Sequence, residues 1–191
     1  MSVTSPPIEL VERQRPITVE EYHRMIDAGI LHEDEHVELV DGFLVAMTPQ
    51  KSPHAYAIQE LTRLLTRSLS REFAVRVQLP LTLGPRSEPE PDIAIVLDSR
   101  QLAVAHPTTA LLVMEVSRGS LRYDRTVKAR LYARHGIPEY WIVNVAERVI
   151  EVRRDPDAGA GYRAAFTAGP GEPITAKSVP GVVVDLADLL G

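Results

Sequence analysis

The sequence predicts a mixed α/β (α+β) fold, because helical and strand-like segments alternate along its 191 residues. Residues 52–70 carry apolar side chains at the spacing of an amphipathic helix, and residues 121–135 do the same. Residues 93–97, 111–117 and 139–145 are short apolar runs rich in β-branched residues, which is typical of strands. Hydrophobic residues make up 45% of the chain, which is enough for a sizeable core.

The composition limits the kinds of site that the chain can hold and indicates its domain organisation and cellular compartment. The chain has no cysteine, which excludes disulfides and thiolate zinc sites and suits a reducing cytoplasm. Residues 1–15 lack the apolar segment of a signal peptide, and no apolar run approaches the length of a membrane span. We therefore expect a cytoplasmic protein without a membrane partner. A flexible N-terminal arm is expected over residues 1–16 and a single domain over 17–191.

The first elements have recognisable start and turn signals. Thr18 and Glu21 have the spacing of a capping box, which predicts a helix over residues 18–28. Residues 36–47 read as a hairpin that turns at Asp41-Gly42, since this dipeptide favours tight turns between strands. The long helix over 52–70 comes next.

The later elements are placed by apolar runs and by the breakers between them. We expect one or two strands over 73–83 with a break at Pro80, strands over 93–97 and 111–117, a helix over 121–135, strands over 139–145 and 148–153, a turn over 155–161, strands near 162–167 and 182–185, and a closing turn at 186–190.

Charge is distributed unevenly along the chain. Residues 118–154 hold nine basic and four acidic residues, a net charge of +5, so the rest of the chain carries −10 within a total of −5. Such asymmetry would allow one face to meet a polyanion. The alternative is a solvated helix face next to an exposed strand.

Two acidic residues lie in strand-like, apolar surroundings. Asp92 opens the run 93–97, and Glu115 interrupts the run 111–117 near its end. Burial of a lone carboxylate is costly unless its charge is compensated, and two carboxylates on neighbouring strands would also repel each other. A divalent cation removes both problems, and Mg²⁺ prefers carboxylates together with water and phosphate oxygens. This pattern favours metal-dependent cleavage of a phosphodiester, although Asp92 alone could be a strand-start cap.

Glu38 and Lys128 complete the candidate constellation. Glu38 alternates with apolar neighbours in the first hairpin, and on its own it could face solvent. Val127 and Leu131 define an apolar stripe that should face the sheet, which places Lys128 at the border of the buried face. A cation there could stabilise charge on a phosphoryl oxygen. A surface ion pair between Asp124 and Lys128, four residues apart, is the alternative.

Contacts to nucleic acid are expected from the start of the long helix and from the basic segment. His54 follows a proline at the helix start and could touch phosphate, whereas many such histidines are ordinary surface groups. Arg118, Arg122 and Arg125 could hold flanking phosphates without reading bases. The sequence has no zinc-protease histidine pair, no Walker loop, no nucleophile elbow and no dinucleotide fingerprint.

The order of these motifs resembles the Uma-type restriction endonuclease family within the PD-(D/E)XK nuclease superfamily, over about residues 17–190. The resemblance rests on the segments Glu38-Leu39-Val40-Asp41-Gly42, Met47 to His54, Pro91-Asp92 and Glu115-Val116-Ser117, followed by Asp124, Lys128, Tyr132, Gly136, Ile137, Glu139, Tyr140 and Trp141.

This resemblance implies a restriction-endonuclease-like fold, a central mixed sheet flanked by helices. It implies Asp92 and Glu115 as ligands of Mg²⁺ (or Mn²⁺), joined by the backbone carbonyl of Val116, with Glu38 as a further acidic residue. One departure is that Ser117 occupies the place of the usual lysine, which makes Lys128 the substitute.

The function expected from these residues is a metal-dependent endonuclease that hydrolyses DNA. The alternatives are a non-catalytic nucleic-acid-binding module with a decayed site, a metal-free hydrolase that uses two carboxylates, and a structural subunit that acts through a dimer surface. A homodimer is expected because duplex DNA has two-fold pseudo-symmetry, with Tyr140, Trp141 and Val143 as apolar contacts for the partner.

Overall fold

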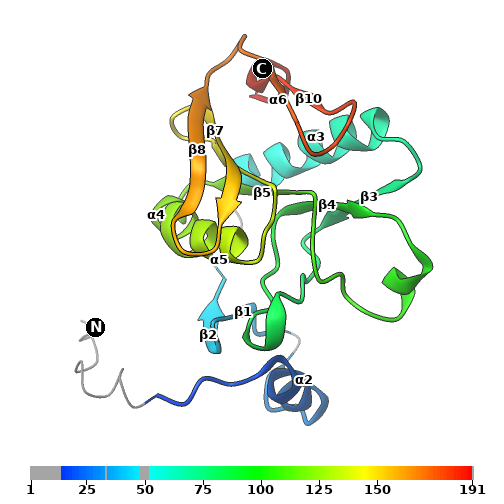
Figure 1. The fold of residues 1–191 in the computed structure, drawn as a ribbon, viewed down its shortest axis with the longest axis vertical. Helices are drawn as coiled ribbons and strands as arrows, with labels where there is room; N and C mark the ends of the chain where they lie inside the picture. The colour runs from blue at the N-terminus through cyan, green and yellow to red at the C-terminus, as the bar shows by residue number, and fades with distance from the viewer. Residues whose placement is uncertain (1–13, 33, 48–51, 191) are drawn as a thin grey trace.

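A six-stranded mixed sheet forms the centre of the computed structural model, which describes residues 14–32, 34–47 and 52–190 (Figure 1). The strand order is β3-β4-β5-β6-β7-β8, and only β5 and β6 pair in parallel. These strands are β3 (Phe73–Val77), β4 (Ile93–Leu97), β5 (Leu112–Ser117), β6 (Glu139–Asn144), β7 (Val149–Asp157) and β8 (Gly161–Ala168). The mixed α/β fold with a central mixed sheet is thus confirmed.

The other elements surround this sheet. They are α2 (Val19–Asp27), β1 (Val37–Val40), β2 (Phe43–Ala46), α3 (Ser52–Ser68), η1 (Gly84–Arg86), η2 (Arg100–Ala103), α4 (Leu121–Tyr123), the π-helix η3 (Asp124–Lys128), α5 (Ala129–Arg134), β9 (Ile174–Thr175), β10 (Val183–Val184) and α6 (Leu186–Leu190). In the described ranges, no helix is long and apolar enough to cross a membrane. Residues 1–13 of the expected N-terminal arm lie outside the described residues.

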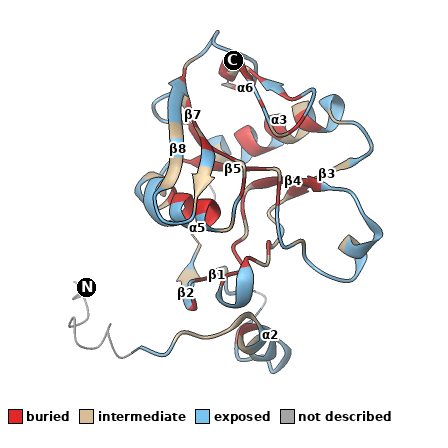
Figure 2. Cartoon of the chain, in the orientation of Figure 1, coloured by how far each residue is buried: buried red, intermediate tan, exposed pale blue. Residues whose placement is uncertain are grey.

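Two apolar layers cover the two faces of the sheet. On one face, α3 buries Ala57, Ile58, Leu61 and Leu65 against the sheet, as its helical spacing predicts. On the other face, α5 buries Leu131 and Tyr132 against neighbouring strands. Strands β4 and β5 are therefore buried along almost their whole length (Figure 2), which explains their nearly continuous apolar sequences.

The N-terminal elements follow their local sequence signals. Thr18 caps α2 in a complete capping box with Glu21. The hairpin of β1 and β2 turns at Asp41 and Gly42, which have φ of +52° and +84°. These angles suit a type I′ turn, and they favour glycine at the second position. A Cβ at Gly42 would also overlap Pro16.

Several boundaries differ from the sequence predictions. Strand β3 stops at Val77 because Gln78 leaves the extended conformation with φ of +51°, so 73–83 holds one strand. The turn expected over 155–161 is shorter, since β7 continues to Asp157. Asp155 has φ of +58° and does not pair with β8, whereas Arg154 before it and Pro156 after it do.

The residues expected to face a partner belong to the core. Tyr140, Trp141 and Val143 are fully buried, so their proposed role as a dimer surface is wrong. The reason is topological, because β6 lies between β5 and β7 and is covered on both faces. An apolar run in a central strand fills the interior rather than a partner interface.

A buried carboxylate fixes the C-terminal segment to the sheet. Glu139 accepts hydrogen bonds from the Lys177 and Ser178 amides (2.6 and 2.7 Å) and from the Arg154 guanidinium (2.6 Å). Arg154 also donates to the Thr175 carbonyl at 2.6 Å. The Ser178 hydroxyl also donates to Glu139, at 2.7 Å, and together with the contacts above it holds the pKa of Glu139 below its usual range despite burial. This residue therefore has a structural role, away from the candidate site.

Candidate metal and nucleic-acid site

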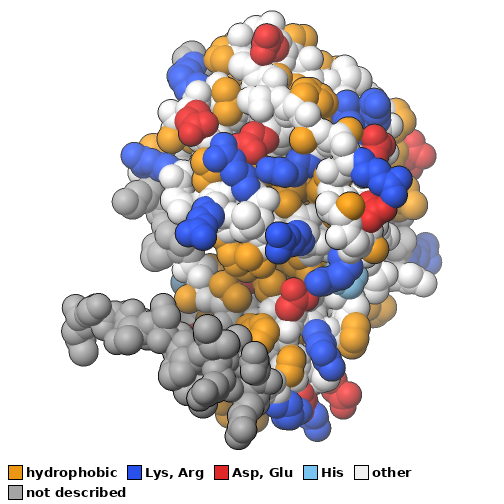
Figure 3. Space-filling model, turned by 60° about the vertical axis from the view of Figure 1, so that its left-hand side comes forward, with side chains coloured by type: hydrophobic (Ala, Val, Ile, Leu, Met, Phe, Trp, Pro, Cys, Tyr) orange, Lys and Arg blue, Asp and Glu red, His pale blue; other side chains and the backbone are white. Residues whose placement is uncertain are grey.

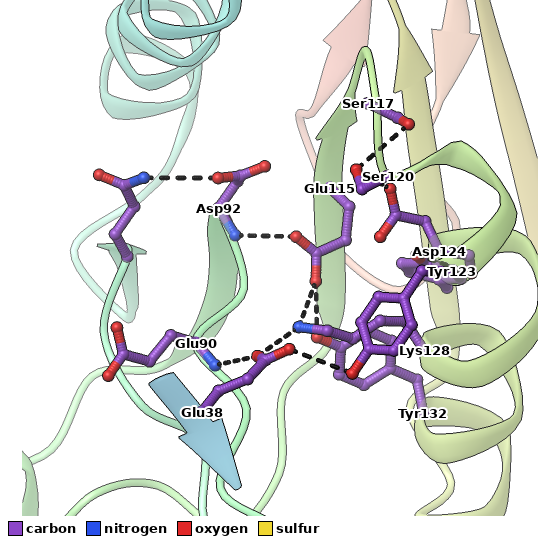
Figure 4. Close-up of polar contacts among 12 residues, drawn as sticks. Glu38, Glu90, Asp92, Glu115, Ser117, Ser120, Tyr123, Asp124, Lys128 and Tyr132 are labelled. Carbon is purple, nitrogen blue, oxygen red and sulfur yellow. Dashed lines mark hydrogen bonds and ion pairs between the residues drawn. The ribbon is translucent and has the colours of Figure 1, made fainter. Parts of the chain in front are cut away.

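Asp92 and Glu115 meet at the junction of two antiparallel strands. The register aligns Ile93 with Met114, so Asp92 and Glu115 are opposite each other one step beyond. The Asp92 amide donates to Glu115 Oε2 at 3.2 Å, and the Val116 amide donates to Asp92 Oδ2 at 2.8 Å. The carboxylates themselves point in different directions in Figure 4, that of Glu115 toward Lys128.

Lys128 lies between two buried carboxylates. Its Nζ donates to Glu38 Oε2 at 2.6 Å and to Glu115 Oε1 at 3.2 Å (Figure 4). The hydroxyl of Tyr132, one helical turn along, donates to the same Glu115 oxygen at 2.8 Å. The alternative of a surface pair with Asp124 is therefore wrong. Lys128 reaches from the helix to the sheet, as the sequence predicts.

Glu38 enters the site because β1 docks beside the segment that precedes β4. Leu39 and Glu88 exchange backbone hydrogen bonds of 3.4 and 2.7 Å, which fixes that docking. The Glu90 amide then donates to Glu38 Oε2 at 3.1 Å, and the Tyr123 hydroxyl donates to Oε1 at 3.3 Å. The solvent-facing alternative for Glu38 is wrong, since its side chain is only 5% exposed.

Asp92 forms the more open part of the site. His54 Nε2 lies 3.1 Å from Asp92 Oδ2, and Gln78 donates to Oδ1 at 3.4 Å. The side chains of His54 and Asp92 are 16% and 14% exposed, against 5% for Lys128 and 8% for Glu115. The hydrogen bond to Asp92 raises the pKa of His54, although burial opposes this. Solvent therefore reaches the cluster from the Asp92 side.

Asp124 is a fourth carboxylate that our site prediction omitted. It is buried, and Ser120 donates to its Oδ2 at 2.6 Å. Burial raises its pKa, while Ser120 and Lys128 oppose the rise. Its spacing of four residues from Lys128 was a usable signal, but that spacing equally fits a surface ion pair. Tyr132 belongs to the residues of the family resemblance, whereas Tyr123 and Gln78 had no sequence signal specific to the site.

The π-helix η3 determines which side chains the middle helix buries. Its i→i+5 bonding places Asp124 and Lys128 in the interior, while Val127 is 38% exposed. The prediction that Val127 faces the sheet is therefore wrong, whereas Leu131 is buried as expected. A wider helical turn shifts the buried face away from the position that a regular α-helix would give.

Electrostatic strain concentrates on Glu115. Burial raises its pKa to about 8; Lys128 opposes this rise, and the nearby carboxylates of Asp92, Asp124 and Glu38 add to it. Burial lowers the pKa of Lys128, but the carboxylates of Glu115 and Glu38 outweigh it and raise this pKa well above its usual range. The lysine is thus charged at any working pH, whereas Glu115 binds a proton readily.

The expected phosphate-binding arginines lie outside this cluster. Arg118 and Arg122 are exposed, whereas Arg125 donates to Glu151 at 2.8 and 2.6 Å. The ion pair neutralises much of the charge of Arg125. On the face shown in Figure 3, Lys and Arg side chains are interspersed with Asp and Glu side chains. The face in this view is therefore not uniformly basic.

The donor chemistry of the site fits a hard divalent cation. Within the described ranges, four carboxylates gather here, those of Glu38, Asp92, Glu115 and Asp124; Lys128 bonds to two of them, and His54 contacts Asp92. A divalent cation would offset the surplus of negative charge, and oxygen donors are those that Mg²⁺ prefers. Across the same ranges, no group of three or more His, Asp or Glu side chains is already arranged around a cation position. The fit is therefore one of donor type rather than of a preformed cage.

Comparisons with known proteins agree with the fold and identify the family. A crystal structure of a protein described as a putative nuclease belonging to DUF820, from Anabaena variabilis ATCC 29413, superposes with a TM-score of 0.73. The match covers 92% of this chain and 98% of that chain at 16% sequence identity. No curated protein matches the sequence. The sequence model of the Uma2 family, described as "putative restriction endonuclease", matches residues 19–187, and the chain therefore belongs to the Uma2 family.

Proposed function

We propose that this protein is a metal-dependent endonuclease that hydrolyses phosphodiester bonds in DNA. Asp92, Glu115 and the backbone carbonyl of Val116 would hold Mg²⁺ (or Mn²⁺). The observation that carries the proposal is that Lys128 bonds to the buried Glu115, which lies beside Asp92 on the paired strand. The chain also belongs to a family described as putative restriction endonucleases. The chemistry supplied by the cation would be Lewis-acid stabilisation of phosphoryl charge and a lower pKa for a bound water.

The protein's own residues would position and polarise the substrate. Lys128 is held by Glu38 and Glu115, so its ammonium group is fixed in place before substrate arrives. Because its pKa is raised, it would act as a permanent positive charge that stabilises the transition state, not as a base. Glu38 would position a water or a second metal ion. His54 would donate to a phosphate at the open edge of the site.

A non-catalytic nucleic-acid-binding module with a decayed site is the second candidate. The observation in its favour is Ser117, which occupies the usual lysine position and supplies no positive charge there; its hydroxyl lies 3.4 Å from that of Ser120. This module would bind DNA without metal-dependent turnover. A two-carboxylate hydrolase would instead keep its activity in EDTA.

Substitution of Lys128 separates catalysis from binding. Lys128→Ala should lower the rate of plasmid nicking about 10²-fold or more while DNA affinity barely changes, because transition-state stabilisation is lost. Arg130→Ala is the matched control, since Arg130 is exposed on the same helix. Circular dichroism checks that both variants fold. Equal small losses for the two variants would refute the catalytic role of Lys128.

The assembly and organisation of the chain form a separate part of the proposal. We propose an arm over 1–16, a single domain over 17–191, and a homodimer that matches the two-fold symmetry of duplex DNA. A cytoplasmic location is proposed from the absence of cysteine. Light scattering at micromolar concentration tests the dimer, and a monomer mass would contradict it.

A further inference from the structure

A groove of about 550 Å³ lies between α3 and the sheet-edge strand β3. Its α3 side is lined by Ala55, Gln59, Arg63 and Arg67, among others, and its other side by Val77 and Gln78. Two arginines and several polar side chains line it, with no acidic residue. A groove of this composition suits a polyanion that also presents flat, partly apolar groups.

One end of the groove opens at the candidate site. Gln78 lines the groove and donates to Asp92 at 3.4 Å. Ala55 lines the same end and follows His54, which contacts Asp92 at 3.1 Å. This is also the side from which the buried cluster is reached by solvent, as the exposed fractions of His54 and Asp92 indicate. A strand lying in the groove would thus run directly to the site.

The length and charge of the groove suit a short stretch of nucleic acid. The distance along α3 from Ala55 to Arg67 is about 18 Å at 1.5 Å per residue. That corresponds to about five nucleotides at 3.4 Å per nucleotide of one strand. Arg63 and Arg67 are exposed and one helical turn apart, so they can meet successive phosphates. Arg63 also pairs with Glu60 at 2.9 Å, whereas Arg67 has no partner among the described residues.

We infer that the α3–β3 groove is the track along which a nucleic-acid strand enters the candidate site, with Arg63 and Arg67 on its phosphates. The inference rests on the proposed function and names its substrate-binding surface. It differs from the expectation that Arg118, Arg122 and Arg125 hold the flanking phosphates. Arg125 is already engaged with Glu151, and none of the three arginines lines this groove.

Fluorescence anisotropy with labelled single- and double-stranded oligonucleotides tests the groove. The full chain is used in EDTA, so that binding is measured without cleavage. Each lost phosphate contact weakens binding about fivefold at 0.15 M salt, and the combined Arg63→Ala/Arg67→Ala variant should therefore bind about 25-fold more weakly. The slope of log affinity against log salt should become shallower by about 1.4 for single strands and about 1.8 for duplex. Arg67→Lys should keep most of the affinity.

Arg118→Ala/Arg122→Ala is the matched control, because it removes the same charge from exposed positions outside the groove. Binding of the groove variant within twofold of the unmodified protein, or an equal loss in the control, would overturn the inference. A changed mass in light scattering with unchanged affinity would also overturn it, by indicating that a second copy occupies the groove. The protein could also fail to nick DNA while the groove variant alone loses DNA affinity. That result would support the groove as the binding track and would refute the proposed nuclease activity.

Discussion

Replacing Glu115 with Gln should change how the stability of the protein depends on pH. Glu115 is fully buried beside three other carboxylates, and its pKa is raised to about 8 against an ordinary value of 4.5. Gln resembles the protonated carboxyl in shape and in lack of charge, so the variant removes the titration with little change in packing. A group whose pKa is raised on folding stabilises the protein most at low pH.

The magnitude follows from the change in proton affinity. Each tenfold change in proton affinity is equivalent to about 1.4 kcal/mol. A rise in the pKa of Glu115 from 4.5 to about 8 therefore corresponds to about 5 kcal/mol of folding free energy. This contribution is fully present below pH 4.5 and is lost as the pH rises toward 8 and beyond. At pH 6.5 about half of this contribution should already be lost, and at pH 9 nearly all of it. The unmodified protein should therefore lose stability relative to Glu115→Gln across this window.

Urea unfolding in EDTA, at intervals from pH 4.5 to 9, measures the difference in free energy of unfolding between the two proteins. The other titrating groups contribute to both and largely cancel in that difference. A difference that stays constant within about 1 kcal/mol would refute the assignment of a strained, proton-binding carboxylate at Glu115. If the stability of the unmodified protein instead rose relative to Glu115→Gln with increasing pH, Lys128 would outweigh burial in setting the pKa of Glu115.

Other substitutions test the remaining parts of the structure. Glu139→Ala should lower the free energy of unfolding by about 3–5 kcal/mol in urea titrations, because it leaves the buried Arg154 guanidinium and two amides without their acceptor. Since the pKa of Glu139 is lowered, its contribution should vanish as the pH falls below 4.5, and a stability difference unchanged at pH 3 would contradict this. Gly42→Ala should destabilise the protein by about 1 kcal/mol or more, since φ is +84° and a Cβ would overlap Pro16; an unchanged melting temperature would contradict this. Millimolar Mn²⁺ should raise the melting temperature of the unmodified protein but not of Asp92→Asn, and equal shifts would place the ion elsewhere.

The sequence was sufficient for the parts of the fold that depend on local signals. The capping box of Thr18, the Asp41-Gly42 turn and the helical spacing over 52–70 each produced the expected element. In each case the residues that decide the conformation lie within a few positions of one another. The central strands were also recognisable, because burial on both faces leaves a continuous apolar run.

The sequence was insufficient where packing overrides local pattern. The π-helix exposes Val127 and buries Lys128, and a regular helical period cannot reveal it. The apolar run with Trp141 could have faced a partner or a neighbouring strand, and only the topology decides. In the site, Gln78 meets Asp92 because the chain leaves β3 at a left-handed residue, which residue type alone does not indicate. The segment 48–51 of the family motif lies outside the described residues.

Relaxation of supercoiled plasmid by the purified protein tests the central claim most directly. The proposed function predicts nicking in Mg²⁺ or Mn²⁺, no nicking in EDTA, and loss of nicking in Asp92→Asn with its fold intact. Intact plasmid in either metal, with DNA binding retained, would contradict the nuclease and favour the decayed-site module. Nicking that persists in EDTA would contradict the metal-dependent mechanism.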